Sequence, residues 1–356
     1  MKILQVIPYF CFGGAETMCE NLTYALREMG HDVTVVSLIT DRTPIAQRME
    51  KAGIRILYLD KKLGLDLSMI SKLVKIMKQE KPDVVHTHLN VIKYAAMAAR
   101  LSGIRRCIHT VHNVAHEEAE GRLQKITNTI YFKLGWSVPV ALSPEVQHTI
   151  SDFYGMKKEK IPMIYNGVDL GKCCLKEDYR LSEPVCLLHI GRFNEQKNHK
   201  GLLEAFAKVL EIHPNCCLQL IGDGELQQQT EDYAKALRIL DKVRFLGNQT
   251  NVYPFLQRAD LFLLPSRYEG MPMTIIEAMG TGLPIVASAV GGVPDMLENQ
   301  KSGILVNCEP DEIAKAVKML LEQEPLRKNL GKNARNAANQ FGAEHMARCY
   351  AAVYQQ

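Results

Sequence analysis

The chain has 356 residues, of which 47% are hydrophobic and 23% charged, and its formal net charge is +4. Because this length exceeds the roughly 250 to 300 residues at which a single core stops growing, we expect two domains. The sequence has no run of about 18 apolar residues, which excludes a bilayer-spanning helix. Its basic excess is too small for a nucleic-acid-binding protein.

The first half alternates apolar segments of strand length with helical segments, a pattern typical of a parallel sheet covered by helices. The predicted strands are residues 3–7, 33–38, 54–59, 84–86 and 107–110. The first strand begins directly after Met1-Lys2 and stops at Pro8, too short for the core of a signal peptide, so we expect a cytoplasmic protein. Gly13 and Gly14 then open a helix, where their backbone could approach a phosphate closely.

Lysines recur from Lys61 to Lys81, with apolar side chains between them at helical spacing. This pattern favours a surface helix with a core-facing stripe, and the alternative is a patch that faces an anionic membrane. Residues 1–170 carry 22 Lys/Arg and 17 Asp/Glu, a net charge of +5, whereas the remainder carries 21 and 22. An attraction to anionic lipid would therefore involve the first half.

Histidines gather at the ends of two predicted strands: His86, His88, His109 and His112, with His116 nearby. Such a cluster could hold zinc, but side chains alternate along a strand, so fewer than five imidazoles can converge. We expect some of them to be buried and one or two to face a cleft. The ten cysteines are scattered without the spacing of a zinc site, and we expect them to be reduced.

Residues 161–184, which contain glycine, proline and many charges, separate the two halves. The strand pattern restarts at residues 185–190, 217–221, 243–245, 261–264 and 285–287. We therefore predict an α/β protein with two Rossmann-like, doubly wound parallel sheets, in residues 1–170 and 171–340, that face a cleft between the domains. A helix within 341–356 could pack on either domain. Ligands of such sheets bind outside the carboxyl ends of the strands.

Arg192 and Lys197 flank a tight loop after the strand 185–190. Two cations there could neutralise a diphosphate, although an ordinary solvated loop would have the same composition. The sequence has no Asp-x-Asp motif that would hold a divalent ion on a nucleotide sugar. Gly222 and Gly224 nearly match a dinucleotide fingerprint, but Gln227 replaces its third glycine, so we predict only a turn.

The most informative stretch follows the strand 261–264, where Glu269 lies on a loop and Pro272 precedes a helix that continues to Gly280. The first-turn amides of this helix, at Met273, Thr274 and Ile275, would bind an anion. Glu277, one turn further, could accept hydrogen bonds from ribose hydroxyls, and Glu269 could do so from sugar hydroxyls. The alternatives are a solvated helix residue and a loop charge.

Together these motifs resemble the family 4 glycosyltransferases, which are retaining, metal-independent enzymes of the GT-B fold. The resemblance covers nearly the whole chain. It rests on two glutamates separated by seven residues and on four glycine- or cation-containing motifs: Glu269 and Glu277; Gly191-Arg192 with Lys197; Gly13-Gly14-Ala15-Glu16; residues 278–284; and Gly291-Gly292. It implies that Glu277 binds the donor ribose, that Glu269 and Gly270 contact the donor sugar, that Arg192 and Lys197 hold the diphosphate, and that His112 lies beside the reacting sugar.

More loosely, the chain resembles bacterial enzymes that build capsule, exopolysaccharide or lipid-linked sugar chains. This implies a hexosyltransferase-type enzyme that uses a nucleotide diphosphate sugar, a UDP-sugar above all, and a glycan or lipid-linked acceptor in polysaccharide biosynthesis. His88 and Asn113 would contact the acceptor, no cofactor or metal would be needed, and the protein would contact the inner face of the cell membrane peripherally. Two alternatives stay open: a nucleotide-sugar epimerase of the same fold and a noncatalytic sugar-nucleotide-binding protein.

Overall fold

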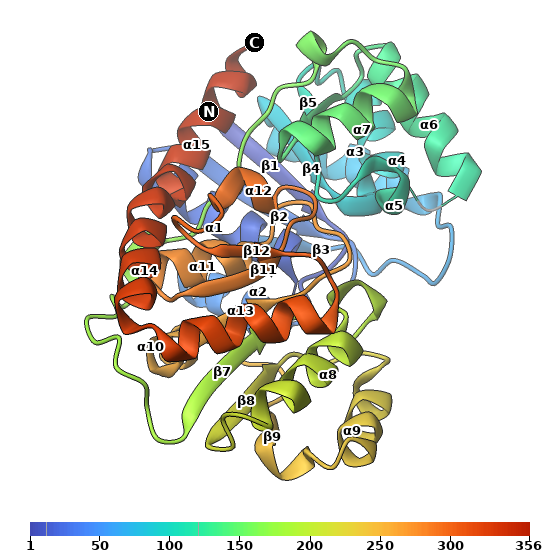
Figure 1. Cartoon of the computed structure of the whole chain (residues 1–356). Coiled ribbons are helices and arrows are strands. Elements are labelled where there is room, and N and C mark those ends of the chain that lie inside the picture. The colour runs from blue at the N-terminus through green and yellow to red at the C-terminus, as the bar shows by residue number, and fades with distance from the viewer. Residues whose placement is uncertain (12, 120) are drawn as a thin grey trace. The chain divides into compact units, whose positions relative to one another are not determined.

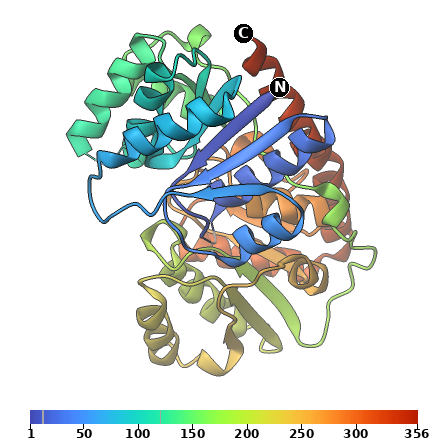
Figure 2. The same cartoon turned by 180° about the vertical axis from the view of Figure 1, so that it is seen from behind.

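The computed structural model describes residues 1–11, 13–119 and 121–356, and the chain divides into two compact units. Unit 1 comprises Met1–Gly167 and Ala343–Gln356, and unit 2 comprises Val168–Gly342. Each unit contains one six-stranded sheet in which all neighbouring strands are parallel (Figures 1 and 2). The predicted α/β architecture with two doubly wound sheets is confirmed.

The sheet of unit 1 has the strand order β3-β2-β1-β4-β5-β6. Helices cover a parallel sheet of this kind on both faces, which explains why its central strands are almost completely buried, their polar side chains included. The strands are β1 (Lys2–Ile7), β2 (Asp32–Ser37), β3 (Arg55–Tyr58), β4 (Val84–His88), β5 (Cys107–Val111) and β6 (Val138–Ala141). The helices are α1 (Gly14–Glu28), α2 (Pro44–Lys51), α3 (Ser68–Glu80), α4 (Ile92–Leu101), α5 (Ala115–Glu118), α6 (Gly121–Lys133), α7 (Pro144–Tyr154) and α15 (Ala343–Gln355).

The sheet of unit 2 repeats this topology, with the order β12-β11-β10-β7-β8-β9. In both units the chain reverses its direction of growth between the first and fourth strands, and this is the point where doubly wound sheets bind ligands. The strands are β7 (Val185–Ile190), β8 (Cys216–Ile221), β9 (Val243–Phe245), β10 (Leu261–Leu264), β11 (Ile285–Ser288) and β12 (Ile304–Val306). The helices are α8 (His199–Leu210), α9 (Gln227–Ala236), α10 (Tyr253–Arg258), α11 (Met273–Thr281), α12 (Val293–Met296), α13 (Pro310–Glu322) and α14 (Glu324–Ala338).

Each half has one strand more than the sequence pattern predicted. The additional strands, β6 and β12, are edge strands of four and three residues. β6 contains Pro139, which has no N–H to donate and is tolerated only where one side of a strand is unpaired. Pro139 disguises β6 in a search for strand-length apolar runs, and β12 offers only the three residues Ile304–Val306.

The last helix, α15, belongs to unit 1 and packs on α1. Its Tyr350 and Tyr354 are fully buried, and their hydroxyls bind Thr110 Oγ1 and His86 Nδ1, both at 2.7 Å. Both chain termini consequently lie at the same end of unit 1 (Figures 1 and 2). No helix among the described residues is long and apolar enough to cross a membrane.

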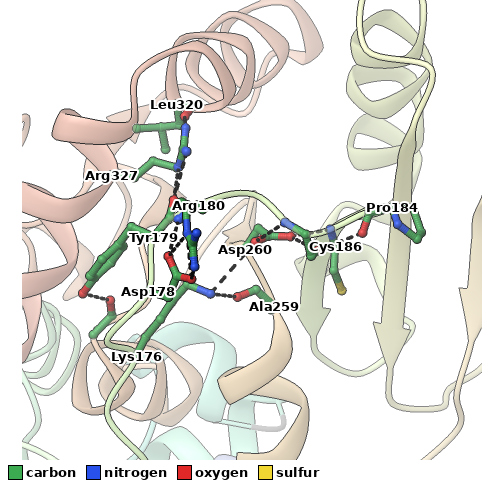
Figure 3. A network of polar contacts seen from close by, with 12 residues as sticks. Lys176, Asp178, Tyr179, Arg180, Pro184, Cys186, Ala259, Asp260, Leu320 and Arg327 are labelled. Atoms are coloured by element: carbon green, nitrogen blue, oxygen red, sulfur yellow. Dashed lines mark hydrogen bonds and ion pairs between the residues drawn. The ribbon is translucent and has the colours of Figure 1, made fainter.

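The charged segment before β7 is anchored to unit 2 by a polar network (Figure 3). Lys176 Nζ donates to the carbonyl of Ala259 at 2.8 Å, and the buried carboxylate of Asp260 accepts from the backbone N–H of Cys186 at 2.8 Å. The buried Arg327 donates to the carbonyl of Tyr179 at 2.9 and 3.0 Å. These bonds satisfy charges that would otherwise be costly to bury, so the segment is part of unit 2 rather than a free linker.

Candidate functional site

The topology of unit 2 explains why two distant loops meet. β7 and β10 are neighbours in the sheet, so the loops that leave their carboxyl ends lie at one edge. The first loop contains Arg192 and the 3₁₀ turn Glu195–Lys197, and the second contains Glu269. A backbone hydrogen bond of 2.8 Å, from the N–H of Arg267 to the carbonyl of Gln196, joins them.

Lys197 and Glu269 form an ion pair between these loops. Lys197 Nζ lies 2.5 Å from Glu269 Oε1, with side chains only 15% and 5% exposed. Gln196 Nε2 supports the pair by donating to the carbonyl of Tyr268 at 2.9 Å and to Glu269 Oε2 at 3.4 Å. The alternative in which Glu269 is a solvated loop charge is therefore wrong.

Arg192 is placed differently. Its side chain is 58% exposed and lies 3.7 Å from the exposed carboxylate of Glu225, a distance at which a surface pair contributes little. The backbone beside it is tightly held, because a Cβ at Gly222 would come within 2.1 Å of the carbonyl oxygen of Gly191. Gly222 and Gly224 thus allow their backbone to pass close to that of Gly191 and Phe193. This packing explains both glycines without a dinucleotide fingerprint.

Helix α11 starts at Met273 without a side-chain cap, so Met273, Thr274 and Ile275 form its first turn as predicted, but the N–H of Ile275 donates to the carbonyl of Pro272 at 3.2 Å. Such a turn favours an anion through its N–H groups and the helix dipole. Glu277 follows one turn later and is buried, which excludes the alternative of a solvated helix residue. Gly270 is buried beside this turn, and its carbonyl accepts from the N–H of Gly292 at 2.8 Å.

The glycine loop of unit 1 lies at the start of α1. Gly13 is the N-cap residue, and a Cβ there would come within 2.4 Å of Glu16 Oε2. Glu16 is buried, and its Oε1 accepts from Cys11 Sγ at 2.9 Å. The sequence predicts a phosphate beside Gly13 and Gly14. In this structure the anionic group at the N-terminus of α1 is the carboxylate of Glu16.

Three imidazoles of unit 1 converge on one side of the sheet. His112 Nε2 lies 3.1 Å from His88 Nδ1, and His88 Nε2 lies 2.9 Å from Gln5 Oε1. The ring of His86 is 4.3 Å from that of His88. His109 instead binds Thr87 and Glu118, and the side chain of His116 is exposed. The expectation that fewer than five histidines converge is met.

Burial keeps the converging imidazoles neutral. It lowers the pKa of His112 to about 4, although the nearby Glu118 carboxylate opposes the shift, and it lowers the pKa values of His86 and His88 well below their usual range. Both nitrogens of His86 and of His88, and Nε2 of His112, are engaged within this cluster or with Gln5, Thr110 and Tyr354. The part of the chain that the structure describes contains no group of three or more His, Cys, Asp or Glu residues that could hold a metal ion.

The predicted acceptor residues differ in accessibility. His88 has no exposed surface, and both of its ring nitrogens have partners. Asn113 is half-buried, and its Oδ1 accepts from the N–H of Val114 at 2.8 Å. Any contact of His88 with an acceptor would therefore pass through His112.

Three residues that organise these sites were not among the predicted ones: Gln5, Glu118 and Gln196. Glu118 accepts from the backbone N–H groups of His112 and Asn113 and so fixes the loop after β5. A polar residue inside the apolar run 3–7 was an available signal for Gln5. Gln196 has no such signal, because its partners come from another loop, 72 and 73 residues away. Glu118 binds His109, His112 and Asn113, which are near it in the chain, but no motif in the sequence marks it.

Comparison with known proteins places the chain among glycosyltransferases. Residues 12–172 match the family described as Glycosyltransferase Family 4, and residues 176–337 match Glycosyl transferases group 1. The UDP-Gal:alpha-D-GlcNAc-diphosphoundecaprenol alpha-1,3-galactosyltransferase of Escherichia coli is 30% identical over 76% of this chain and 74% of its own. The N-acetyl-alpha-D-glucosaminyl L-malate synthase of Bacillus anthracis is 28% identical over 99% and 97%.

The fold is also shared with solved structures. Anabaena Alr3699/HepE in complex with UDP-glucose has a TM-score of 0.88 at 20% identity, with complete coverage of both chains. Sucrose-phosphate synthase from Thermosynechococcus elongatus has a TM-score of 0.81 at 22% identity, over 100% of this chain and 99% of that one. With its two matched halves and the paired parallel sheets of the GT-B fold, the chain belongs to the family 4, group 1 glycosyltransferases, which transfer a sugar from a nucleotide sugar.

Proposed function

We propose that the enzyme transfers a hexosyl group from a UDP-sugar to a glycan or lipid-linked acceptor in polysaccharide biosynthesis, with retention of configuration and without a metal ion. The name of the Escherichia coli relative specifies UDP-Gal and a diphosphoundecaprenol-linked acceptor. Anabaena HepE, which shares the fold, is solved with UDP-glucose. Both support a uridine nucleotide, and the first supports a lipid-linked acceptor.

The observation that carries the proposal is the arrangement at the β7–β10 edge of unit 2. Lys197 is paired with the buried Glu269, Glu277 is buried one turn into α11, and the uncapped first turn of α11 lies between them in the chain. The cations Lys197 and Arg192, with the first-turn amides, would offset the charge that grows on the diphosphate as the sugar leaves. Glu277 would accept hydrogen bonds from the ribose hydroxyls, and Glu269, with Gly270 beside it, from the sugar.

In unit 1 we assign His112 to the reacting sugar and Asn113 to the acceptor, following the family pattern. A neutral imidazole suits this role, because it can donate or accept a hydrogen bond without repelling the positive charge of a developing oxocarbenium ion. Burial supplies that neutrality at physiological pH. His88 would act only by orienting His112.

The donor is tested by thermal unfolding with UDP-, GDP- and ADP-sugars. A ligand at 100 times its Kd stabilises the folded protein by about 2.7 kcal/mol, so the UDP-sugars should raise the Tm and the others should not. Stabilisation by a GDP- or ADP-sugar alone would overturn the assignment of the base. Conversion of the sugar in the absence of any acceptor would instead indicate an epimerase.

Metal independence and stereochemistry need separate measurements. Transfer should survive exhaustive treatment with EDTA, since the proposed cations are side chains, and NMR of the product should show the anomeric configuration of the donor. Loss of transfer that manganese or magnesium restores would contradict the first expectation. Restoration by zinc would point to the histidine cluster, and an inverted product would contradict the second expectation.

A further inference from the structure

Helix α6 of unit 1 has an inverted pattern of burial. It buries the polar side chains of Gln124 and Asn128, which are 5% and 3% exposed, whereas Leu123, Ile126, Ile130 and the following Leu134 are 46% to 65% exposed. A single exposed leucine needs no explanation. Four aliphatic side chains that are exposed together, on a helix that buries amide side chains, do need an explanation.

The exposed residues form one stripe, because positions 123, 126, 130 and 134 follow the three- and four-residue spacing of a helix face. The opposite side of α6 is fixed by Tyr131 and Phe132, which belong to the core, and by Asn128 Nδ2, which lies 3.4 Å from Tyr154 Oη on α7. Among the described residues, Asn128 Oδ1 and Gln124 Oε1 are buried without a hydrogen-bond partner. Burying two amide oxygens without hydrogen-bond partners is unfavourable, and the helix nevertheless leaves its apolar stripe exposed.

A second apolar segment lies beside α6. Leu63, Leu65 and Leu67, in the loop before α3, are 103%, 61% and 65% exposed. This loop and α6 both attach to the first turn of α4: the N–H of Asp66 binds Tyr94 Oη at 3.2 Å, and Tyr131 Oη binds the carbonyl of Lys93 at 3.4 Å. Figures 1 and 2 show the loop and α6 on the same side of unit 1.

We call these seven side chains the apolar face: Leu63, Leu65, Leu67, Leu123, Ile126, Ile130 and Leu134. Basic residues flank it. Arg122, Lys125 and Lys133 are exposed on α6, which carries no acidic residue, and Lys61 and Lys62 begin the loop. In the sequence Glu117, Glu118 and Glu120 precede α6, and Glu118 is engaged with His109.

We propose that the apolar face docks unit 1 on an anionic lipid bilayer. Its residues are all aliphatic, whereas interfaces between proteins concentrate their binding energy in tryptophan, tyrosine and arginine. A bilayer requires only apolar side chains to enter the acyl boundary and cations to meet the headgroups. The proposal deepens the proposed function by placing a lipid-linked acceptor at this surface, but the docking itself does not depend on which sugar is transferred.

The structure also relocates the membrane contact that the sequence suggested. In the segment Lys61–Lys81, helix α3 buries Met69, Leu73 and Met77, so it is a surface helix with a core-facing stripe. Only the loop before it contributes apolar side chains to the face. The lysines of α3 alone would attract the protein to an anionic membrane but would insert no apolar side chain into it.

The test is sedimentation of the full chain with phosphatidylglycerol-containing and with pure phosphatidylcholine vesicles. We expect association with the anionic vesicles that weakens at high salt. The variant Ile126→Ser with Ile130→Ser should lower this association on the order of 10-fold or more, because it removes two inserting side chains. The matched control is Leu175→Ser with Ile212→Ser, which replaces residues of unit 2 that are 51% and 57% exposed and should bind as the wild type does.

Donor-induced thermal stabilisation of each variant by UDP-sugars separates this proposal from the proposed function. Loss of vesicle binding with unchanged donor stabilisation supports docking through α6. No vesicle association of the wild type, or equal association of both variants, overturns the docking proposal whatever the donor result is. If the wild type is a dimer in solution and Ile126→Ser with Ile130→Ser makes it monomeric, the face joins two copies of the chain, and the bilayer proposal is again overturned.

Discussion

Glu277 is a carboxylate buried one turn inside α11, in unit 2. Replacement by glutamine keeps its size and removes its charge, so we predict that Glu277→Gln weakens donor binding about 10- to 100-fold, as expected for a lost hydrogen bond to a charged group. Because a ribose contact acts in the ground state and the transition state alike, kcat should change less than the affinity. Calorimetric titration with a UDP-sugar measures this. Glu298→Gln, at an exposed carboxylate that pairs with Lys301, is the control, and unchanged affinity of Glu277→Gln would remove the ribose assignment.

Substitutions at Lys197 and Arg192 should affect turnover alike but the stability of the fold differently. Lys197→Met leaves the Glu269 carboxylate buried without its ammonium partner, so we predict a loss on the order of 3 kcal/mol in the free energy of unfolding. Arg192→Ala, at an exposed side chain, should leave stability nearly unchanged. Turnover should fall about 10²-fold or more in both if, as we propose, the two cations offset the charge that grows on the diphosphate.

The double variant Lys197→Met with Glu269→Gln sharpens this test. It removes both charges, and it should recover stability in urea unfolding without recovering turnover. Full turnover in either single cation variant would make that cation structural.

Gln5 determines which nitrogen of His112 carries the proton. Gln5 Nε2 donates to Thr23 Oγ1 at 2.7 Å, and that hydroxyl donates to the carbonyl of Cys19 at 2.7 Å, so Gln5 Oε1 must face His88 as an acceptor. His88 Nε2 is then protonated, and its Nδ1 accepts from the Nε2–H of His112. The Nδ1 of His112 keeps its lone pair.

We predict that nitrogen NMR at pH 7 shows both His88 and His112 as neutral Nε2–H tautomers. Gln5→Leu should release this constraint and mix the tautomers, while Gln147→Leu, on the surface helix α7, should not. A protonated Nδ1 on either ring of the wild type would contradict the chain of donors.

At the scale of elements, the loop after β11 is held against the loop after β10. Gly291 has φ +56°, and a Cβ there would come within 1.7 Å of the carbonyl oxygen of Glu269. We predict that Gly291→Ala displaces Glu269 and lowers both donor affinity and stability. Gly247→Ala controls for the backbone strain alone, about 1 to 2 kcal/mol, because Gly247 has φ +63° and nothing within 4 Å of its Cβ position.

Donor affinity is the decisive measurement, and it should fall only in Gly291→Ala. If both alanine variants lose stability equally and keep their affinity, then the close approach to Glu269 has no role in donor binding.

The elements also show what sequence can and cannot predict. Ten strands, the α/β class and the start of α11 followed from apolar runs and from Pro272, which are local signals. The edge strands β6 and β12 did not, although the predicted strand β9 is equally short; Pro139 interrupts the pattern of β6. The pair of Lys197 and Glu269 could be predicted as two candidates but not as a contact, since 72 residues separate them and only the strand order brings them together.

At the scale of the whole molecule, both units bury neutral histidines. Burial lowers the pKa of His112 and His189 to about 4 and that of His199 to about 2, and it lowers those of His86 and His88 well below their usual range. In the unfolded chain each imidazole has a pKa of about 6.5. Below that pH the unfolded state binds more protons than the folded state, so stability should be retained above about pH 6.5 and fall as the pH drops towards 4.

Each buried histidine that stays neutral adds up to about 1.4 kcal/mol per pH unit to this fall. His199 offers the sharpest test: it stacks on Phe193 with ring centroids 4.1 Å apart, and neither of its nitrogens has a hydrogen-bond partner among the described residues. We predict that His199→Leu, which keeps a similar volume, stabilises the protein more at pH 5 than at pH 8, because the unfolded variant has one proton fewer to gain. His148→Gln, at an exposed side chain, should leave the difference between the two pH values unchanged. Urea unfolding at both pH values measures the effect, and an equal change in stability for His199→Leu at pH 5 and pH 8 would show that this imidazole does not contribute to the acid sensitivity of the fold.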